Sequence, residues 1–188
     1  VTKNIWNSDN YSNKIHVSIS KIKFQEQPIV EETKEREYTP ENITSLKPNE
    51  VFVFGSNTEG RHGKGAALTA KQKFGAIQGQ AEGLQGQSYA IITKDLAKGE
   101  KSIPLKYSVR NTKSIEDGIE RFLYFARQNP NTKFYVTKLG SSLAGYSVEE
   151  IKNLFKNSLN VIPNNVILPK EYEVRDEDNT PPWDEECN

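Results

Sequence analysis

Short apolar runs alternate with amphipathic segments along the chain from Glu50 onward. The runs over 51–54, 88–93, 134–137 and 166–168 contain no charged residue and are rich in β-branched and aromatic side chains. Continuous apolar runs of this length are typical of strands that are buried on both faces. The pattern therefore predicts four strands in the interior of a sheet.

Three helices are predicted between these strands. Residues 66–74 are rich in alanine and favour a helix. Ser114 is the predicted N-cap of a second helix, which ends at Asn129. Ser147 begins a third helix, in a capping box with the glutamate three residues later. Strands that alternate with helices indicate an α/β fold with a mostly parallel sheet covered on both faces.

The chain divides into three parts by composition. Residues 1–49 form an N-terminal extension in which 15–24 alternates apolar and polar positions with one slip, as in a strand with a bulge. Near its end, Thr39 followed by proline predicts a short helical turn. Residues 50–170 carry the α/β pattern. Residues 171–188 form an acidic tail that is predicted to be disordered.

The formal net charge of zero hides an asymmetry between the tail and the rest of the chain. The tail has eight acidic residues and one arginine, a net charge of −7, which leaves +7 for the rest. A mildly basic body suits an anionic ligand, whether a nucleotide, a nucleic acid or an acidic segment. The acidic tail is therefore expected either to serve a partner or to cover the basic cleft.

Several classes of protein are disfavoured by what the chain contains. No apolar run approaches the roughly 18 residues that cross a bilayer, and the N-terminus does not resemble a signal peptide. The single cysteine, Cys187, has no partner for a disulfide and no neighbouring Cys/His cluster for zinc. We therefore expect a cytoplasmic protein without a metal or a bound cofactor, and the pattern leaves its oligomeric state open.

A glycine-rich loop, residues 55–67, runs from the first buried strand directly into the first helix. Its sequence is GSNTEGRHGKGAA. Glycines let a ligand approach main-chain N–H groups, and the helix N-terminus adds unpaired donors and a partial positive charge. This arrangement predicts an anion site. It matches neither a P-loop nor a dinucleotide-binding fingerprint, so hydrolysis of nucleoside triphosphates is disfavoured.

A second loop, residues 140–146, repeats the arrangement after the third buried strand. Its sequence is GSSLAGY, and a capped helix follows. Two such loops from separate strands of one sheet can each hold one phosphate of a diphosphate, and Ser141 and Ser142 add hydroxyl donors. Tyr146 either covers a ribose or belongs to the core.

Three side chains near these loops are candidates for catalysis. Asn57 follows the first strand, where its amide can hold a ribose hydroxyl or its own turn. His62 lies within the glycine-rich loop, where it is either a general acid or base or simply solvated. Asp95 follows the second strand and lies either beside the same crevice or in a surface turn.

Together, the segments 51–57, 63–67, 89–94 and 139–146 resemble a divergent macrodomain, and the likeness covers about 50–168. Within that superfamily the chain is similar to the branch of terminal ADP-ribose glycohydrolase-like proteins. The resemblance implies a three-layer α/β/α sandwich that binds ADP-ribose. Carried over residue by residue, the implied ligand-binding positions are Gly55, Ser56, Asn57, Gly63, Lys64, Gly65, Ala66, Thr93, Gly140, Ser141, Ser142, Leu143, Ala144, Gly145 and Tyr146.

The chain departs from the hydrolases of that branch at Ala144, where they carry a catalytic Asp. Hydrolysis of ADP-ribosyl adducts would have to rest on Asn57, His62 or Asp95 instead. The leading hypothesis is therefore binding of ADP-ribose or a related NAD-derived nucleotide, free or attached to a macromolecule. The alternatives are an ADP-ribosyl hydrolase or phosphoesterase, a catalytically inert interaction module and a nucleic-acid-binding domain.

Overall fold

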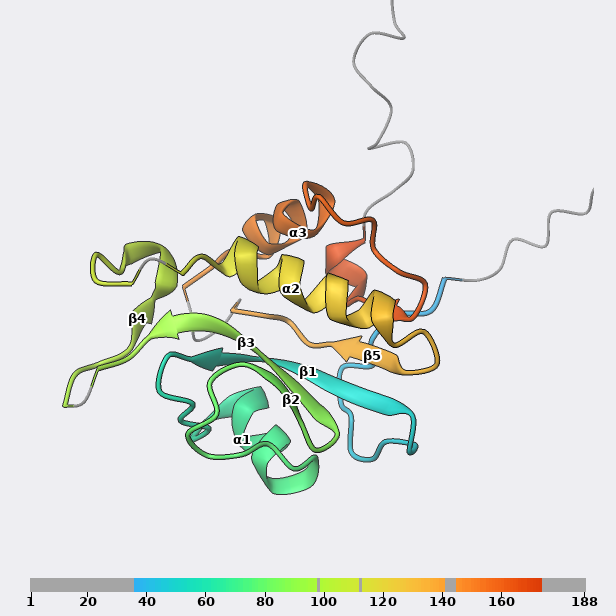
Figure 1. Ribbon diagram of the computed structural model, residues 1–188, viewed down its shortest axis with the longest axis horizontal. Helices are drawn as coiled ribbons and strands as arrows, with labels where there is room; N and C mark the ends of the chain where they lie inside the picture. Colours follow the sequence, from blue (N-terminus) through green and yellow to red (C-terminus); the bar gives the residue numbers. More distant parts are fainter. Residues whose placement is uncertain (1–35, 98, 112, 141–144, 174–188) are drawn as a thin grey trace, which may run out of the picture. The chain divides into compact units, whose positions relative to one another are not determined.

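The computed structural model describes residues 36–173 apart from 98, 112 and 141–144. A mixed sheet of six strands forms its centre, in the order β2-β3-β1-β5-β6, with β4 paired to the far end of β3 (Figure 1). The contacts of β1 with β3 and β5, and of β5 with β6, are parallel, whereas β2 and β4 run antiparallel to β3. The strands are β1 (Glu50–Asn57), β2 (Gly83–Gln85), β3 (Ser88–Asp95), β4 (Ile103–Pro104), β5 (Lys133–Val136) and β6 (Val166–Ile167).

Helices cover both faces of this sheet. Helix α1 (Gly65–Lys73) packs on one face, and α2 (Ile115–Gln128) and α3 (Val148–Lys156) pack on the other (Figure 1). Alternate side chains of β1 enter different cores: Val53 joins the larger one under α2 and α3, and Phe54 joins the smaller one under α1. This alternation follows from the two-residue period of a strand. The predicted α/β class and mostly parallel sheet are confirmed.

The capping residues begin the helices where the sequence predicted. The Ser114 hydroxyl accepts a hydrogen bond from the Asp117 N–H at the start of α2. Ser147 and Glu150 form the expected capping box at the start of α3. Each cap satisfies donors that a helix end otherwise leaves unpaired, so both predicted starts are confirmed.

The helical turn predicted at Thr39 is wrong. The chain has no helical turn there, and the Thr39 N–H donates to the Leu168 carbonyl at 2.9 Å while its hydroxyl donates to the Ile167 carbonyl at 2.7 Å. The hydroxyl that would have capped a helix instead binds the end of β6. The short strands β2 and β4 were not predicted, because two or three residues carry no periodic signal.

The compact unit begins at Arg36 and includes the residues on both sides of 50–170. Tyr172 belongs to a short 3-10 segment, η3 (Lys170–Tyr172), and its buried hydroxyl donates to the Leu139 carbonyl at 3.2 Å. The Tyr38 hydroxyl donates to Glu173 at 2.7 Å. The expected N-terminal strand and most of the acidic tail lie outside the described residues. Within the described part of the chain, no helix has the length and apolar character needed to span a membrane.

The Asn165 side chain provides a test of how the edge of the sheet is held. Its Nδ2 lies 3.0 Å from the Ala126 carbonyl, 2.9 Å from that of Asn129 and 2.8 Å from that of Thr132. Asn165→Asp keeps the shape but points a charged acceptor at three carbonyl oxygens. We expect the free energy of unfolding in urea to fall by about 2 kcal/mol or more.

Asn164→Asp is the matched control, because Asn164 is the exposed neighbour. It should change the free energy of unfolding by less than about 0.5 kcal/mol. Equal effects of the two substitutions would contradict the role assigned to Asn165.

Candidate functional site

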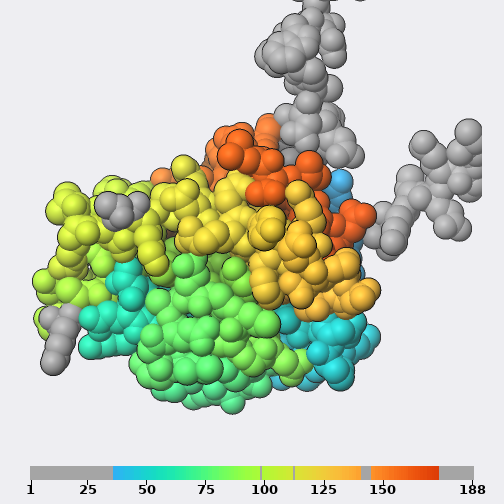
Figure 2. Space-filling model, viewed as in Figure 1, coloured from blue at the N-terminus to red at the C-terminus, as the bar shows by residue number. Residues whose placement is uncertain are grey.

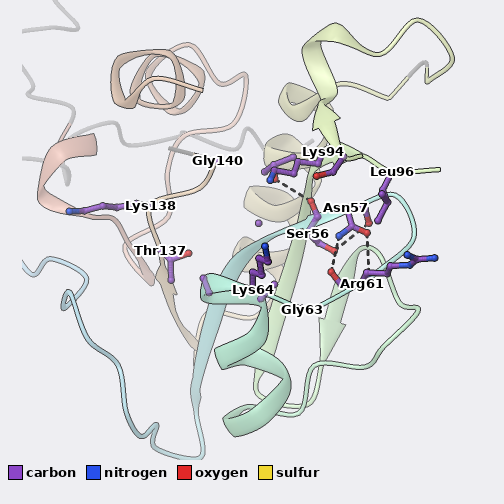
Figure 3. Close-up of a pocket in the computed structure, with 15 residues that line it drawn as sticks. Ser56, Asn57, Arg61, Gly63, Lys64, Lys94, Leu96, Thr137, Lys138 and Gly140 are labelled. Carbon is purple, nitrogen blue, oxygen red and sulfur yellow. Dashed lines mark hydrogen bonds between the residues drawn. The ribbon is translucent and has the colours of Figure 1, made fainter. Parts of the chain in front are cut away.

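A pocket of about 360 Å³ opens where β1, β3 and β5 end (Figure 3). The carboxyl ends of parallel strands meet at one edge of a sheet, which is where α/β proteins bind ligands. The volume is within the range of about 300 to 1,000 Å³ that is usual for small-molecule sites. The lining residues are Gly55, Ser56, Asn57, Arg61, Gly63, Lys64, Ala66, Ala67, Thr93, Lys94, Leu96, Ser102, Thr137, Lys138 and Gly140.

Two glycines allow the pocket to form. A Cβ atom at Gly55 would lie 3.1 Å from Thr93 Oγ1, tighter than nearly all real Cβ contacts, so its absence lets the ends of β1 and β3 approach one another. Gly65, the first residue of α1, has a φ angle of +57°, a backbone conformation that residues other than glycine rarely adopt. The sharp entry into α1 at the pocket wall therefore depends on glycine.

The start of α1 differs from the starts of the other two helices. Its N-cap residue, Lys64, makes no side-chain capping bond, and its first turn has no acidic residue. Helices α2 and α3 have serine caps and two acidic residues each in the first turn. The partial positive charge of the α1 N-terminus thus remains uncompensated beside the pocket, which Ala66 and Ala67 line.

Two lysines add full positive charge to this wall. Neither ammonium group, of Lys64 or of Lys94, forms an ion pair or hydrogen bond with another residue that the structure describes. Burial, and then repulsion by Lys64, lowers the pKa of Lys94. No lining residue among those described is acidic. The pocket therefore presents two uncompensated cations to any ligand.

The other two cations of the lining are engaged in ion pairs. Arg61 pairs with Glu59 at 3.1 Å, and Lys138 pairs with Glu171 at 2.5 Å. Figure 3 shows Lys64 between the strand ends, whereas Arg61 and Lys138 point outward on opposite sides. The centre of the pocket is thus the most favourable place for a negative charge.

The comparisons with known proteins add no relative to this description. No family model, curated protein or solved structure matches the chain. The resemblance of its motifs to macrodomains stays a prediction, and the function has to be inferred from the geometry of the pocket.

Most of the predicted ligand-binding positions line the pocket. These are Gly55, Ser56, Asn57, Gly63, Lys64, Ala66, Thr93 and Gly140. Gly65, Gly145 and Tyr146 do not line it, and Ser141, Ser142, Leu143 and Ala144 lie outside the described residues.

Tyr146 belongs to the larger core. Its side chain is buried among residues of that core, and its hydroxyl accepts a hydrogen bond from the Lys106 N–H at 3.0 Å. A Cβ atom at the neighbouring Gly145 would lie 2.7 Å from Pro104 Cγ, so this segment packs tightly against the end of β4. The end of the second loop thus has a packing role in the described structure.

His62 is fully buried beside the pocket wall and does not line it. Its Nε2 lies 3.0 Å from the Ile77 carbonyl and 3.2 Å from that of Gln80, and its ring meets Phe54 edge to face. Because carbonyls only accept, Nε2 carries the proton. Nδ1 is buried and has no hydrogen-bond partner in the described part of the chain. His62 therefore fixes the glycine-rich loop to the 77–80 turn.

Asp95 is buried and also lies outside the pocket lining. Its carboxylate accepts hydrogen bonds from Ser108 at 2.5 Å, Arg110 at 2.8 Å and Thr58 at 3.0 Å. The bonds from Ser108 and then Arg110 lower its pKa. Figure 2 shows the region after β3 projecting at one end of the molecule, against the residues that follow β1. Asp95 holds these two segments together.

Asn57 is the one predicted catalytic residue that lines the pocket. Its Oδ1 accepts from the N–H groups of Glu59 at 3.2 Å and Arg61 at 3.0 Å, and its Nδ2 donates to the Arg61 carbonyl at 2.8 Å. The carboxamide therefore holds its own turn, one of the two roles expected for it. In the described residues, no three His, Cys, Asp or Glu side chains are grouped to hold a metal ion.

The sequence analysis missed several lining residues. Lys94 directly follows one predicted strand and Thr137 is the last residue of another, so the rule that ligands bind at the carboxyl ends could have found them. Leu96 and Ser102 lie in the connection to β4, which the sequence did not indicate. The remaining missed residues are Arg61, Ala67 and Lys138.

The lowered pKa of Lys94 predicts a reactive amine. At pH 8.5 a larger fraction of Lys94 is unprotonated than of a lysine with the usual pKa, so trinitrobenzene sulfonate should label Lys94 faster than the exposed Lys73 side chain. Peptide mapping by mass spectrometry measures both rates in one sample. Lys64→Gln should slow the labelling of Lys94, because it removes the repulsive charge. Labelling of Lys94 no faster than of Lys73 would contradict the pocket electrostatics.

The buried carboxylate of Asp95 predicts an acid-dependent loss of stability. Because its pKa is lower in the folded protein than in the unfolded chain, its contribution is complete above about pH 5 and disappears as the pH falls below about 4. Asp95→Asn should lower the free energy of unfolding by about 1 to 3 kcal/mol at pH 7. The difference in free energy of unfolding between Asp95→Asn and the unaltered chain should be smaller at pH 3.

Asp117→Asn changes an exposed carboxylate and is the control for this experiment. Its effect should be small at both pH values. Denaturant titrations of the three proteins at pH 7 and pH 3 provide the measurement, and a deficit of Asp95→Asn that is independent of pH would refute the assignment.

Proposed function

We propose that this pocket binds ADP-ribose or a related NAD-derived nucleotide through its diphosphate. The observation that carries the proposal is the pair Lys64 and Lys94, two ammonium groups without a described acidic partner, beside the uncapped start of α1. A diphosphate supplies two negative charges and several acceptor oxygens at the spacing of adjacent phosphates. Charge-assisted hydrogen bonds to phosphate oxygens are among the strongest that proteins make.

The surroundings of the lysine pair support a ligand with two halves. To one side of Lys64 lie Thr137 and Gly140, and to the other lie Asn57 and Leu96 (Figure 3). The Thr137 hydroxyl on one side suits a ribose hydroxyl, the apolar Leu96 side chain on the other suits the rest of an extended ligand, and a central cation suits the phosphates between them. An elongated nucleotide fits these walls better than a simple phosphate does.

The arrangement of the fold supports a macrodomain-like assignment. Helices lie on both faces of a mostly parallel sheet, and the pocket joins the end of β1 with the start of α1, where the macrodomain-like motifs were noted. We therefore include the three-layer macrodomain architecture in the proposal. By the same resemblance, the ligand is either free or attached to an ADP-ribosylated macromolecule.

The proposal concerns binding and not turnover. His62 and Asp95, which the sequence offered for acid–base chemistry, are buried and engaged in holding loops. Asn57 reaches the pocket, but its carboxamide is engaged in its turn.

Isothermal titration of the full chain with ADP-ribose tests the proposal. We expect ADP-ribose to bind and to raise the melting temperature by mass action, and AMP, with one phosphate, to bind more weakly. Lys64→Gln and Lys94→Gln should each weaken ADP-ribose binding about tenfold or more, the loss expected for one charge-assisted hydrogen bond.

Lys73→Gln is the matched control, because it removes an exposed charge from the same helix without touching the pocket. Its affinity for ADP-ribose should equal that of the unaltered chain. Absence of binding at high micromolar concentrations, or equal losses in all three variants, would refute the proposal.

A further inference from the structure

Near the end of the described chain, one acidic residue contacts the pocket lining. Glu171 in η3 pairs with Lys138 at 2.5 Å, and Lys138 lines the pocket. The adjoining Tyr172 is fully buried and bonded to the Leu139 carbonyl, so the end of η3 is fixed beside the end of β5. The acidic segment 174–188 therefore begins three residues after a glutamate that pairs with a residue of the pocket lining.

The charge of that segment complements the charge of the pocket. Residues 174–188 contain six acidic residues and one arginine, a net charge of −5. Lys64 and Lys94 have no acidic partner among the described residues, although Arg61 and Lys138 at the edges of the lining do have one. One contact of this kind is present in the described structure, because Glu171 of the acidic tail pairs with Lys138 of the pocket lining.

The length of the segment is sufficient for it to reach the pocket. Fifteen residues beyond Glu173 span at most about 50 Å when extended, which exceeds the width of a domain of this size. A tethered segment also acts at an effective concentration in the millimolar range, so weak carboxylate contacts suffice for substantial occupancy.

We propose that the acidic segment 174–188 occupies this pocket when no ligand is bound, with its carboxylates on Lys64 and Lys94. An anionic ligand then has to displace the segment, which sets a threshold for binding and favours ligands with more than one negative charge. The identity of the competing nucleotide rests on the proposed function, but the contact between segment and pocket does not.

The single cysteine allows a direct test. Cys187 lies within the segment, so a nitroxide attached to it broadens the NMR signals of nearby amides in the full chain. We expect broadening at Gly63 and Gly140, and recovery of both signals when pyrophosphate is added as the probe. Unbroadened pocket signals would overturn the proposal. So would broadening that appears only between a labelled and an unlabelled copy, because the segment would then act between molecules.

Affinity measurements on the full-length chain provide a second readout. Neutralising the segment should tighten pyrophosphate and ADP-ribose binding about three- to tenfold, because the tethered competitor is lost. Glu116→Gln with Glu149→Gln, two exposed charges on α2 and α3, should leave affinity unchanged. The neutralised variant carries Asp176→Asn, Glu177→Gln, Asp178→Asn, Asp184→Asn, Glu185→Gln and Glu186→Gln.

The two proposals fail in distinguishable ways. If ADP-ribose binds neither the unaltered chain nor the neutralised variant but the nitroxide still broadens the pocket signals, the ligand assignment is wrong. The acidic segment then remains the occupant of the pocket. If ADP-ribose binds the unaltered chain and the neutralised variant with equal affinity, the proposed function stands. Occupancy of the pocket by the segment is then refuted.

Discussion

Burial of β1 on both faces is the constraint on which the rest of the structure depends. A strand that sends Val53 into one core and Phe54 into the other needs helices above and below it, and parallel neighbours on both sides. Parallel pairing places the ends of β1, β3 and β5 at one edge. The loops that leave these strand ends then lie side by side and line one pocket.

Local stability is lower where the pocket forms. Helices α2 and α3 begin with serine caps and acidic first turns, whereas α1 begins at Lys64 with neither. A cap contributes about 1 kcal/mol, and two like charges within one pocket repel each other, so the start of α1 is stabilised less than the starts of α2 and α3. An anion at the start of α1 would supply both a hydrogen-bond acceptor and the negative charge that its first turn lacks.

The sequence predicted most of the fold because its signals are local. Apolar runs, capping residues and the glycine-rich loop each act over a few neighbouring positions, and the predicted helix starts at Ser114 and Ser147 were confirmed. The wrong predictions concern residues whose partners are distant in sequence. Thr39 was misread because its hydrogen-bond partner is Leu168, and His62 and Asp95 were considered for chemistry because Ile77 and Arg110, the residues that engage them, are distant in sequence. Lys94 differs from these residues, because its place directly after a predicted strand is a local signal that already points to the pocket.

The hydrogen bonds of His62 have a consequence for how this protein can change over evolution. The imidazole joins the glycine-rich loop to the 77–80 turn through two carbonyls, and Gly60 lies so close to that turn that a Cβ there would meet Gly79 at 2.6 Å. An insertion in either loop would break both contacts at once. The two segments therefore constrain each other's length, and an insertion in either is expected to loosen the other.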